Sequence, residues 1–324
     1  MKVLFIGGTG IISSACASLA LDAGIDLYLL NRGRSALRPI PPAATVLTGD
    51  IRDPSIADVL GDHTFDVVVD WIAYAPEHVA RDLELFRGRT GQYLFISSAS
   101  AYQKPPERLP ITEDTPLHNP FWAYSRNKAA CEARLMAGYH DQGFPVTIVR
   151  PSHTYDRTLL PFRGGYTIID RMRRGKPILV HGDGTSLWTL THHLDFARAF
   201  VPLLGEPRAI GEAYHITSDE WLTWNEIARL LGEAAGVEPA IAHVPSDFVA
   251  RFDADWGDSL LGDKSHCTIF DNSKIRQIVP GFAAEIPFKT GAREIVDWFD
   301  ANPAEQQPDT VFDGILDRII SALG

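Results

Sequence analysis

Residues 3–13, Val-Leu-Phe-Ile-Gly-Gly-Thr-Gly-Ile-Ile-Ser, join an apolar run to a glycine-rich turn and a second apolar run. The first run predicts a buried strand, and the segment after Gly10 predicts a helix. Glycines at such a junction permit a tight turn and let backbone amides approach an anion at the positively polarised helix N-terminus. The stretch therefore predicts a βα unit that binds the pyrophosphate of a dinucleotide.

The same alternation of strand and helix continues through the first half of the chain. Short apolar runs that predict strands buried on both faces occur at Val3–Ile6, Leu27–Leu30, Thr45–Leu47, Val67–Asp70, Tyr93–Ile96 and Val146–Val149. Segments between them show helical spacing, as in Val79, Leu83 and Phe86. We therefore expect an α/β fold, a Rossmann-type doubly wound parallel sheet with helices on both faces.

The pattern becomes less regular after Pro151. Thr223 and Glu226 form the capping box of a predicted helix, and Asp195 is expected to cap another helix. We expect residues 1–153 to form a dinucleotide-binding domain, with 188–216 returning to it, and residues 154–187 and 217–324 to form a smaller, mixed α/β substrate-binding domain.

The composition excludes several functional classes. The net charge of −11 over 324 residues makes nucleic acid a poor partner. Three scattered cysteines exclude a disulfide scaffold and a cysteine-rich zinc site. No apolar stretch approaches the length of a membrane span, and the first apolar run is too short for a signal peptide. We therefore expect a cytoplasmic protein without a membrane partner.

Two predicted strand ends carry residues suited to the adenosine half of a dinucleotide. An acidic residue at the end of the second strand would bind the ribose 2′-hydroxyl of NAD, but Asn31 and Arg32 stand there. Arg32, with Arg34 nearby, suits a 2′-phosphate, which favours NADP over NAD. The alternative is that both arginines are solvated loop charges. After the third strand, Asp50 can accept from the adenine amine while Ile51 packs on its ring.

Tyr124 and Lys128 lie four residues apart, which places them on one face of a helix. A nearby ammonium favours the phenolate and lowers the phenol pKa towards the working range of an acid–base catalyst. Ser98 belongs to a serine cluster at the end of the fifth strand, the sheet edge where ligands bind. Its hydroxyl can hold a substrate carbonyl oxygen. The alternatives are an unrelated pair on a surface helix and a polar turn.

The order of these motifs resembles that of the extended short-chain dehydrogenases/reductases, in the NAD-dependent epimerase/dehydratase group. The similarity covers most of the chain, through Gly7–Ile12, Asp50–Ile51, Tyr124–Lys128, Arg150–His153, Gly182–Gly184, His192–Asp195 and Tyr214–Ile216. The resemblance implies that Tyr124 is the acid/base catalyst, that Lys128 tunes it and binds the nicotinamide ribose, and that Ser98 holds the reacting oxygen. It also implies that the cofactor is lined by Gly7, Thr9, Gly10, Ile11, Ile12, Trp71, Ile72, Ala73, Pro151, Ser152 and His153.

Two departures from that family bear on the substrate. Dehydratases acting on nucleotide sugars carry an Asp-Glu pair after the catalytic Ser or Thr, whereas this chain has Ala99 and Ser100. Sugar-nucleotide members place an arginine on the diphosphate where this chain has Trp188. A nucleotide sugar is therefore disfavoured. Trp188, Phe121 and Trp122 predict an apolar substrate pocket, with core packing as the alternative.

We therefore expect an NAD(P)-dependent oxidoreductase that transfers hydride to or from a small carbonyl or alcohol substrate. The alternatives are an NAD(P)-dependent sugar epimerase and a non-enzymatic RNA-binding or nicotinamide-sensing relative. No metal is expected, because the resemblance explains His192, His193 and Asp195 as a structural turn before a helix. The resemblance further implies a possible homodimer through two helices of the cofactor domain.

Overall fold

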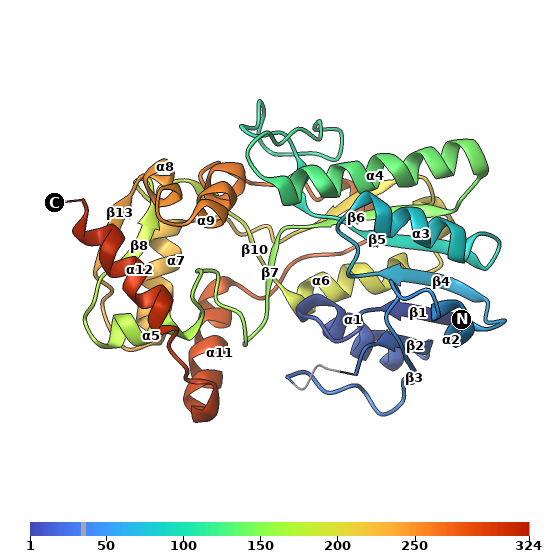
Figure 1. Ribbon diagram of the computed structural model, residues 1–324, viewed down its shortest axis with the longest axis horizontal. Coiled ribbons are helices and arrows are strands. Elements are labelled where there is room, and N and C mark those ends of the chain that lie inside the picture. Colours follow the sequence, from blue (N-terminus) through green and yellow to red (C-terminus); the bar gives the residue numbers. More distant parts are fainter. Residues whose placement is uncertain (34–36, 324) are drawn as a thin grey trace.

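A sheet of seven parallel strands organises the N-terminal part of the molecule (Figure 1). The computed structural model describes residues 1–33 and 37–323. The strand order is β11-β6-β5-β4-β1-β2-β3. The chain adds β2 and β3 on one side of β1 and then continues with β4 on its other side, so the strand order switches between β1 and β4. The strands are β1 (Lys2–Ile6), β2 (Asp26–Asn31), β3 (Thr45–Thr48), β4 (Phe65–Asp70), β5 (Thr90–Ile96), β6 (Val146–Pro151) and β11 (Ala213–Ile216). The expected doubly wound fold is confirmed.

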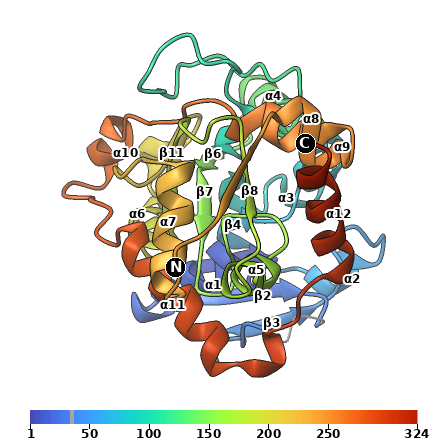
Figure 2. The same cartoon turned by 90° about the vertical axis from the view of Figure 1, so that its left-hand side faces the viewer.

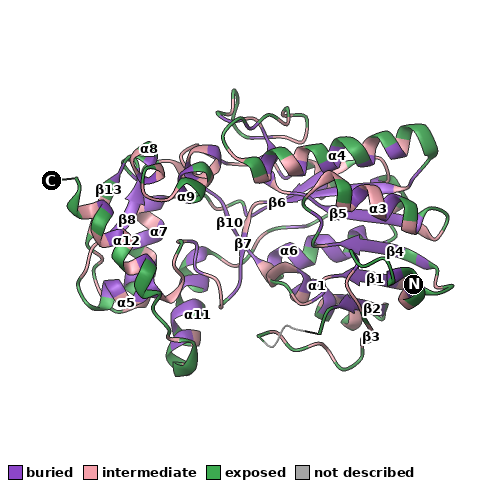
Figure 3. Ribbon diagram, in the orientation of Figure 1, coloured by how far each residue is buried: buried purple, intermediate pink, exposed green. Residues whose placement is uncertain are grey.

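Helices cover both faces of this sheet, because its central strands are apolar on both faces. Valines and leucines of one face pack with α1 (Ile11–Asp22) and α6 (His193–Phe200). The opposite face packs with α2 (Ile56–Leu60), α3 (Pro76–Phe86) and α4 (Ala123–Gln142). β6 is buried along its full length and β1, β4 and β5 along most of theirs (Figure 3), whereas the edge strand β3 is mostly exposed. This layering leaves the ends of the strands open for a ligand.

The C-terminal part has its own core and lies at one end of the sheet (Figures 1 and 2). Its strands form short pairs, β7 (His153–Tyr155) with β10 (Leu190–His192), β9 (Leu187–Trp188) with β12 (Leu222–Thr223), and β8 (Ile178–His181) with β13 (Ile241–Val244). Its helices are α5 (Tyr166–Arg173), α7 (Trp224–Ala234), α8 (Ser246–Ala250), α9 (Ala254–Ser259), α11 (Phe288–Ala301) and α12 (Thr310–Ser321), and α10 (Ser273–Ile278) packs beside β11. The short helical turns are η1 (Ala99–Ala101), η2 (Val201–Leu203), η3 (Pro207–Ala209), η4 (Leu260–Lys264, a π-helix) and η5 (Pro303–Glu305).

Local capping signals were informative for one helix and misleading for another. At the start of α7, the Thr223 side chain accepts from the Glu226 amide, and the Glu226 carboxylate accepts from the Thr223 amide at 2.8 Å. Asp195, in contrast, does not cap a helix, because α6 begins two residues earlier with His192 as its N-cap. The Asp195 carboxylate is instead buried and accepts from the backbone amide of Ile286 at 2.9 Å. That contact joins α6 to a segment 91 residues away.

Packing divides the chain differently from the expected domain boundaries at two places. Trp188 and Leu190, expected to return to the sheet, belong to the core of the C-terminal part. Ile275 and Phe282, expected in the C-terminal domain, pack in the core beneath the sheet. No described helix combines the length and apolar character needed to cross a membrane.

Candidate active site

The glycine turn between β1 and α1 has the geometry that its sequence predicts. Gly7 has φ of +89°, and a Cβ there would lie 2.4 Å from Cγ2 of Ile72. Ser13 stands where a third glycine is usual, and its hydroxyl accepts from the Gly10 amide at 2.8 Å and donates to the Gly7 carbonyl at 2.9 Å. The serine thus stabilises the turn through two hydrogen bonds from α1. A side chain at Gly7 is excluded by the positive φ and by the close approach of Ile72.

A cavity of about 250 Å³ lies over this turn at the carboxyl edge of β1, β2 and β3. Predicted residues that line it are Gly7, Thr9, Gly10, Asn31, Arg32, Asp50, Ile51 and Ile72. The buried Nδ2 of Asn31 has no hydrogen-bond partner among residues 1–33 and 37–323. Two features fit a bound dinucleotide: the turn at Gly7 leaves no room for a Cβ, and the unpaired amide donor of Asn31 lies at the edge of the cavity. Arg34 lies outside the described residues.

Arg32 and Asp50 face each other across the rim of this cavity. The Arg32 Nη1 atom is 3.7 Å from the Asp50 Oδ2 atom, and both side chains are substantially exposed. An exposed pair at this distance contributes little stability, so the guanidinium can turn towards a ligand at small cost.

The remaining predicted cofactor residues take other positions. Ile11 and Ile12 form the half-buried first turn of α1. Trp71 packs beneath the sheet edge against Phe5 and Phe200, with ring centroids 5.3 and 4.8 Å away. Ala73 presents its carbonyl oxygen to Lys128. Asp70, which the sequence analysis missed, shapes this loop because its carboxylate accepts from the Ile72 and Ala73 amides at 2.7 and 2.9 Å.

Tyr124 and Lys128 lie on one face of α4, as their spacing predicts. The Lys128 Nζ atom is 5.8 Å from the centroid of the Tyr124 ring. It donates to the carbonyl oxygens of Ala73 and Ile96, each at 2.7 Å. These two carbonyls belong to the loop after β4 and to the end of β5, so the sheet edge fixes the position of the ammonium.

The pKa of Tyr124 differs from the expectation. Burial raises the Tyr124 pKa to about 12. A hydrogen bond with Ser98 lowers this pKa in part, and the negative charge of Asp263 raises it further. The expected lowering by Lys128 is absent: its ammonium lies over the ring at 5.8 Å from the centroid and donates to the carbonyl oxygens of Ala73 and Ile96. Burial also lowers the pKa of Lys128 to about 8. The phenol is therefore protonated at neutral pH.

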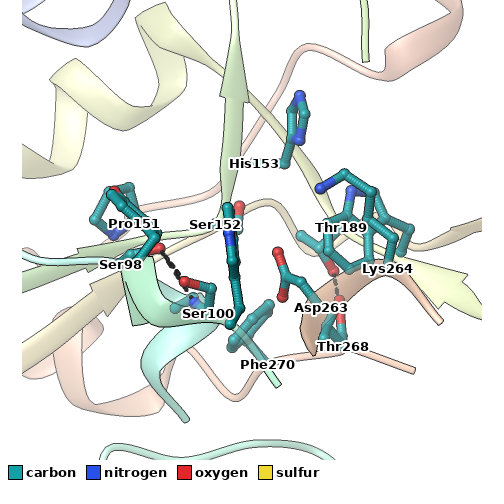
Figure 4. Close-up of a pocket in the computed structure, with 14 residues that line it drawn as sticks. Ser98, Ser100, Pro151, Ser152, His153, Thr189, Asp263, Lys264, Thr268 and Phe270 are labelled. Atoms are coloured by element: carbon teal, nitrogen blue, oxygen red, sulfur yellow. Dashed lines mark hydrogen bonds between the residues drawn. The ribbon is translucent and has the colours of Figure 1, made fainter. Parts of the chain in front are cut away.

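Ser98 and Tyr124 line a second cavity, of about 230 Å³. The Ser98 hydroxyl lies 2.9 Å from the Ser100 hydroxyl, which accepts from Ser125 at 2.8 Å (Figure 4 shows the first contact). A donor chain of three hydroxyls thus fixes Ser98 at the end of β5. Because Ser125 follows Tyr124 in α4, the same contacts fix the start of α4 relative to the end of β5.

The walls of this second cavity combine expected and unexpected residues. Trp122 and Trp188 line it, as expected for the substrate pocket. Pro151, Ser152 and His153, which were expected beside the cofactor, also line this cavity and not the one over the glycine turn. Phe121 does not line it, because its side chain is exposed and its ring lies 6.1 Å from that of His266. Residues that the sequence analysis missed are Thr189, Asp263, Lys264, Thr268 and Phe270. They come from the link between β9 and β10, from the π-helix η4 and from the extended segment after it, all distant in sequence from Ser98 and Tyr124, and no local pattern gives a signal for them.

His153 occupies the border between this cavity and a third one of about 310 Å³. Burial, reinforced by the charge of Lys264, lowers the pKa of His153 to about 3, so the imidazole is neutral. Its Nε2 atom and the Trp188 Nε1 atom are buried without a hydrogen-bond partner in the described part of the chain. Within that same part, no three His, Cys, Asp or Glu side chains are grouped to hold a metal ion.

The chain matches the NAD dependent epimerase/dehydratase family over residues 3–217. A chloroplast stem-loop binding protein of 41 kDa from Arabidopsis thaliana is 27% identical over 76% of this chain and 67% of its own length. The 2′-dehydrokanamycin reductase of Streptomyces kanamyceticus is 26% identical over 78% and 71%. A UDP-glucose 4-epimerase of Lactobacillus helveticus is 33% identical, over 46% of this chain and about half of its own length.

Solved structures share the fold at low identity. An epimerase of Methanothermobacter thermautotrophicus superposes with a TM-score of 0.77 at 18% identity, covering 94% of both chains. The UDP-glucuronic acid 4-epimerase of Bacillus cereus, solved with UDP-glucuronic acid and NAD, gives 0.76 at 19% identity over 93% of this chain and 99% of its own. The chain therefore belongs to the NAD dependent epimerase/dehydratase family, a family of NAD-dependent epimerases, dehydratases and reductases.

Proposed function

We propose that this protein is an NAD(P)-dependent oxidoreductase that reduces a small carbonyl compound which is not a nucleotide sugar. The observation that carries the proposal is the meeting of Ser98 and Tyr124 in one cavity, beside the buried ammonium of Lys128. The sheet part supplies the cofactor cavity, and the C-terminal part supplies the opposite wall of the substrate cavity.

The reaction divides its tasks between the cofactor and these side chains. A nicotinamide cofactor supplies the hydride when bound. Ser98 donates a hydrogen bond to the substrate carbonyl oxygen and fixes its orientation. Tyr124 transfers its phenolic proton to that oxygen as the carbonyl carbon receives the hydride, so that an alcohol forms and the phenolate regains a proton from solvent. Lys128, held by two carbonyls, keeps a positive charge near the phenolate that this step creates.

The protonation state of Tyr124 fits the role of an acid. Because burial raises the Tyr124 pKa to about 12, the phenol carries its proton at neutral pH and is ready to act as an acid. Oxidation of an alcohol would require the phenolate, which is the minor form until the pKa is lowered. In the free protein Tyr124 is therefore ready to act as an acid, whereas the net direction of the reaction depends on the concentrations of substrate, product and the two cofactor forms.

The substrate class follows from the cavity walls. Trp188, buried in the wall, stands where sugar-nucleotide members carry an arginine, and an indole does not neutralise a diphosphate. Ala99 and Ser100 provide no carboxylate for the elimination of water. These residues favour a compact ketone or aldehyde with apolar parts over a nucleotide sugar as the substrate that accepts the hydride.

We further infer that the cofactor is NADP(H). Arg32 is exposed at the rim of the cofactor cavity, and its weak pairing with Asp50 leaves the guanidinium able to bind a 2′-phosphate. Titration with NADPH and NADH compares the two affinities directly. Arg32→Ala should weaken NADPH binding about 10-fold or more and leave NADH binding nearly unchanged. Equal losses for both cofactors would refute the preference.

The decisive experiment combines a substrate screen with one conservative variant. Purified protein is tested for NADPH and NADH oxidation with a panel of ketones and aldehydes. Tyr124→Phe should reduce kcat by about 10²- to 10⁴-fold, because the proton donor is lost, while cofactor affinity is retained. Undiminished turnover in that variant would exclude Tyr124 as the acid. Retention of RNA on a filter, without oxidation of either cofactor, would favour a binding protein.

A further inference from the structure

Lys264 ends the π-helix η4 and lines the cavity that contains Ser98 and Tyr124. Its Nζ atom lies 5.6 Å from the centroid of the Trp122 ring and 5.8 Å from that of Trp188. Figure 4 shows Lys264 and Thr189 on the wall opposite Ser98. The ammonium therefore lies between two indoles, across the cavity from the hydroxyl that would hold the reacting oxygen.

The Lys264 ammonium makes no direct ion pair within residues 1–33 and 37–323, although the charge of Asp263 acts on it from a distance. Its Nζ atom also donates no hydrogen bond to those residues, whereas other lysines of the C-terminal part, such as Lys176 and Lys289, pair with carboxylates. The neighbouring carboxylate of Asp263 lies 3.3 Å from the buried Nζ of Lys104. Two indoles compensate an ammonium only in part, because a cation–π contact is weaker than a charge-assisted hydrogen bond.

The surroundings of Lys264 connect the reacting centre to a larger apolar space. Lys264, Trp122 and His153 line both the catalytic cavity and the adjoining cavity of about 310 Å³. Most side chains that wall the adjoining cavity are apolar, among them Leu160, Phe162, Leu179, Trp224, Trp256 and Leu260, and the charged Arg163 and Asp255 also line it. A ligand whose carbonyl oxygen binds to Ser98 would thus have Lys264 on the opposite wall of the same cavity, facing the substituent beyond its carbonyl carbon.

Given the proposed reductase function, we propose that Lys264 binds a single oxyanion of the substrate, a carboxylate or a phosphate monoester, between the rings of Trp122 and Trp188. The substrate is then a carbonyl compound that carries one compact negative group on the side facing the indoles. Lys264 selects among carbonyl compounds by charge, whereas Ser98 and Tyr124 act on the carbonyl itself.

The electrostatics around Lys264 agree with an anionic ligand. Burial lowers its pKa, Asp263 raises it, and the cations Lys104 and Arg163 lower it again. An oxyanion against the ammonium would offset the effects of burial and of the two cations, because it stabilises the protonated lysine. Binding of the anion and protonation of Lys264 would therefore reinforce each other.

The test is a ligand-observed NMR titration of the full chain with benzoate, phenyl phosphate and the neutral analogue benzamide. Wild-type protein should bind at least one of the two anions more tightly than benzamide, and the anion that binds better identifies the oxyanion. Lys264→Met, which keeps an unbranched chain on the indoles, should weaken that anion about 10- to 100-fold and leave benzamide binding within about 2-fold. Lys264→Arg should restore most of the loss.

Lys289→Met is the matched control, because it removes a lysine of the same part of the molecule that pairs with Glu233 on the surface. It should bind all three compounds as the wild-type protein does. The proposal is overturned if wild-type protein shows no preference for either anion over benzamide, or if Lys264→Met binds the preferred anion as tightly as wild type.

Activity separates this proposal from the function on which it rests. Suppose that neutral ketones are reduced in a Tyr124-dependent manner, but that a negative group on the compound changes neither its binding nor its reduction. The oxyanion site is then refuted and the reductase function stands. If the anion binds through Lys264 but no carbonyl compound is reduced, the reductase function is refuted instead.

Discussion

The two parts of the molecule bury their apolar residues in different ways. In the sheet part, consecutive residues of each central strand are buried on alternating faces, so a short apolar run in sequence is a buried strand in space. In the C-terminal part, one core gathers side chains from Tyr155 to Ile319, supplied by short strand pairs and separate helices. Sequence patterns are therefore easier to interpret in the first part than in the second.

The functional residues follow the same division. The glycine turn, Ser98 and the Tyr124–Lys128 pair each sit at a strand end or on a helix face of the sheet part. Asp263 and Lys264 come from a π-helix that reaches the cavity only because the C-terminal part packs across the sheet edge. We expect substitutions in the cofactor cavity of the first part to impair cofactor binding and those in the second part to leave it intact.

Gly7→Ala should give the largest effect and sharpen this comparison. The positive φ and the 2.4 Å approach to Ile72 Cγ2 force either strain or displacement of a residue lining the cofactor cavity. We expect about 1–3 kcal/mol of lost stability and at least about a 100-fold loss of NADPH affinity, measured by fluorescence titration.

Gly24→Ala is the control for this experiment. Gly24 also has positive φ, of +77°, but a Cβ there meets no atom of the described residues within 4 Å and lies outside the cofactor cavity. It should lose about 1 kcal/mol of stability while retaining NADPH affinity. Equal affinity losses in both variants would mean that strain alone, and not the cavity, controls cofactor binding.

The pH dependence of stability tests the burial of Lys128. Its pKa falls from 10.5 to about 8 on folding, so the unfolded chain binds more protons between these values and stability from this group rises with pH across that window. Relative to Lys128→Met, wild-type protein should gain up to about 3 kcal/mol from pH 8 to pH 10.5. Parallel curves from denaturant unfolding would contradict the shift.

Gly291→Ala should give a smaller effect, confined to the C-terminal part. A Cβ on Gly291 would lie 2.2 Å from the buried Tyr155 hydroxyl, so α11 must shift away from that core. We expect about 1–3 kcal/mol of destabilisation in thermal unfolding, with NADPH affinity unchanged. A parallel loss of affinity would break the proposed separation of the two parts.

Gly314→Ala is the control for Gly291→Ala and has the smallest expected effect, with the opposite sign. Gly314 lies within α12, and a Cβ there meets no atom within 4 Å in the part of the chain that the structure describes. The substitution should stabilise the protein by about 0.5–1 kcal/mol, because alanine restricts the unfolded chain and favours the helix. Destabilisation would show that α12 does not tolerate a side chain at this position.

The sequence predicted most of the cofactor cavity and less than half of the substrate cavity. Gly7, Asn31 and Asp50 follow strands whose order along the chain sets their place at one sheet edge. Phe121 was expected in the substrate cavity beside Trp122, but α4 begins at Ala123 and directs the two aromatic side chains differently. Adjacent residues before a helix share no face, so their direction depends on the packed loop.

The sequence by itself determined the parallel sheet, the glycine turn, the helix face shared by Tyr124 and Lys128, and the capping box at Thr223. Each depends on interactions within a few residues, or on apolar periodicity. Only the tertiary structure decided the pKa of Tyr124, the burial of Asp195 against Ile286, and the position of Lys264 between two indoles. These properties arise from desolvation and from contacts between distant segments, which spacing along the chain does not encode.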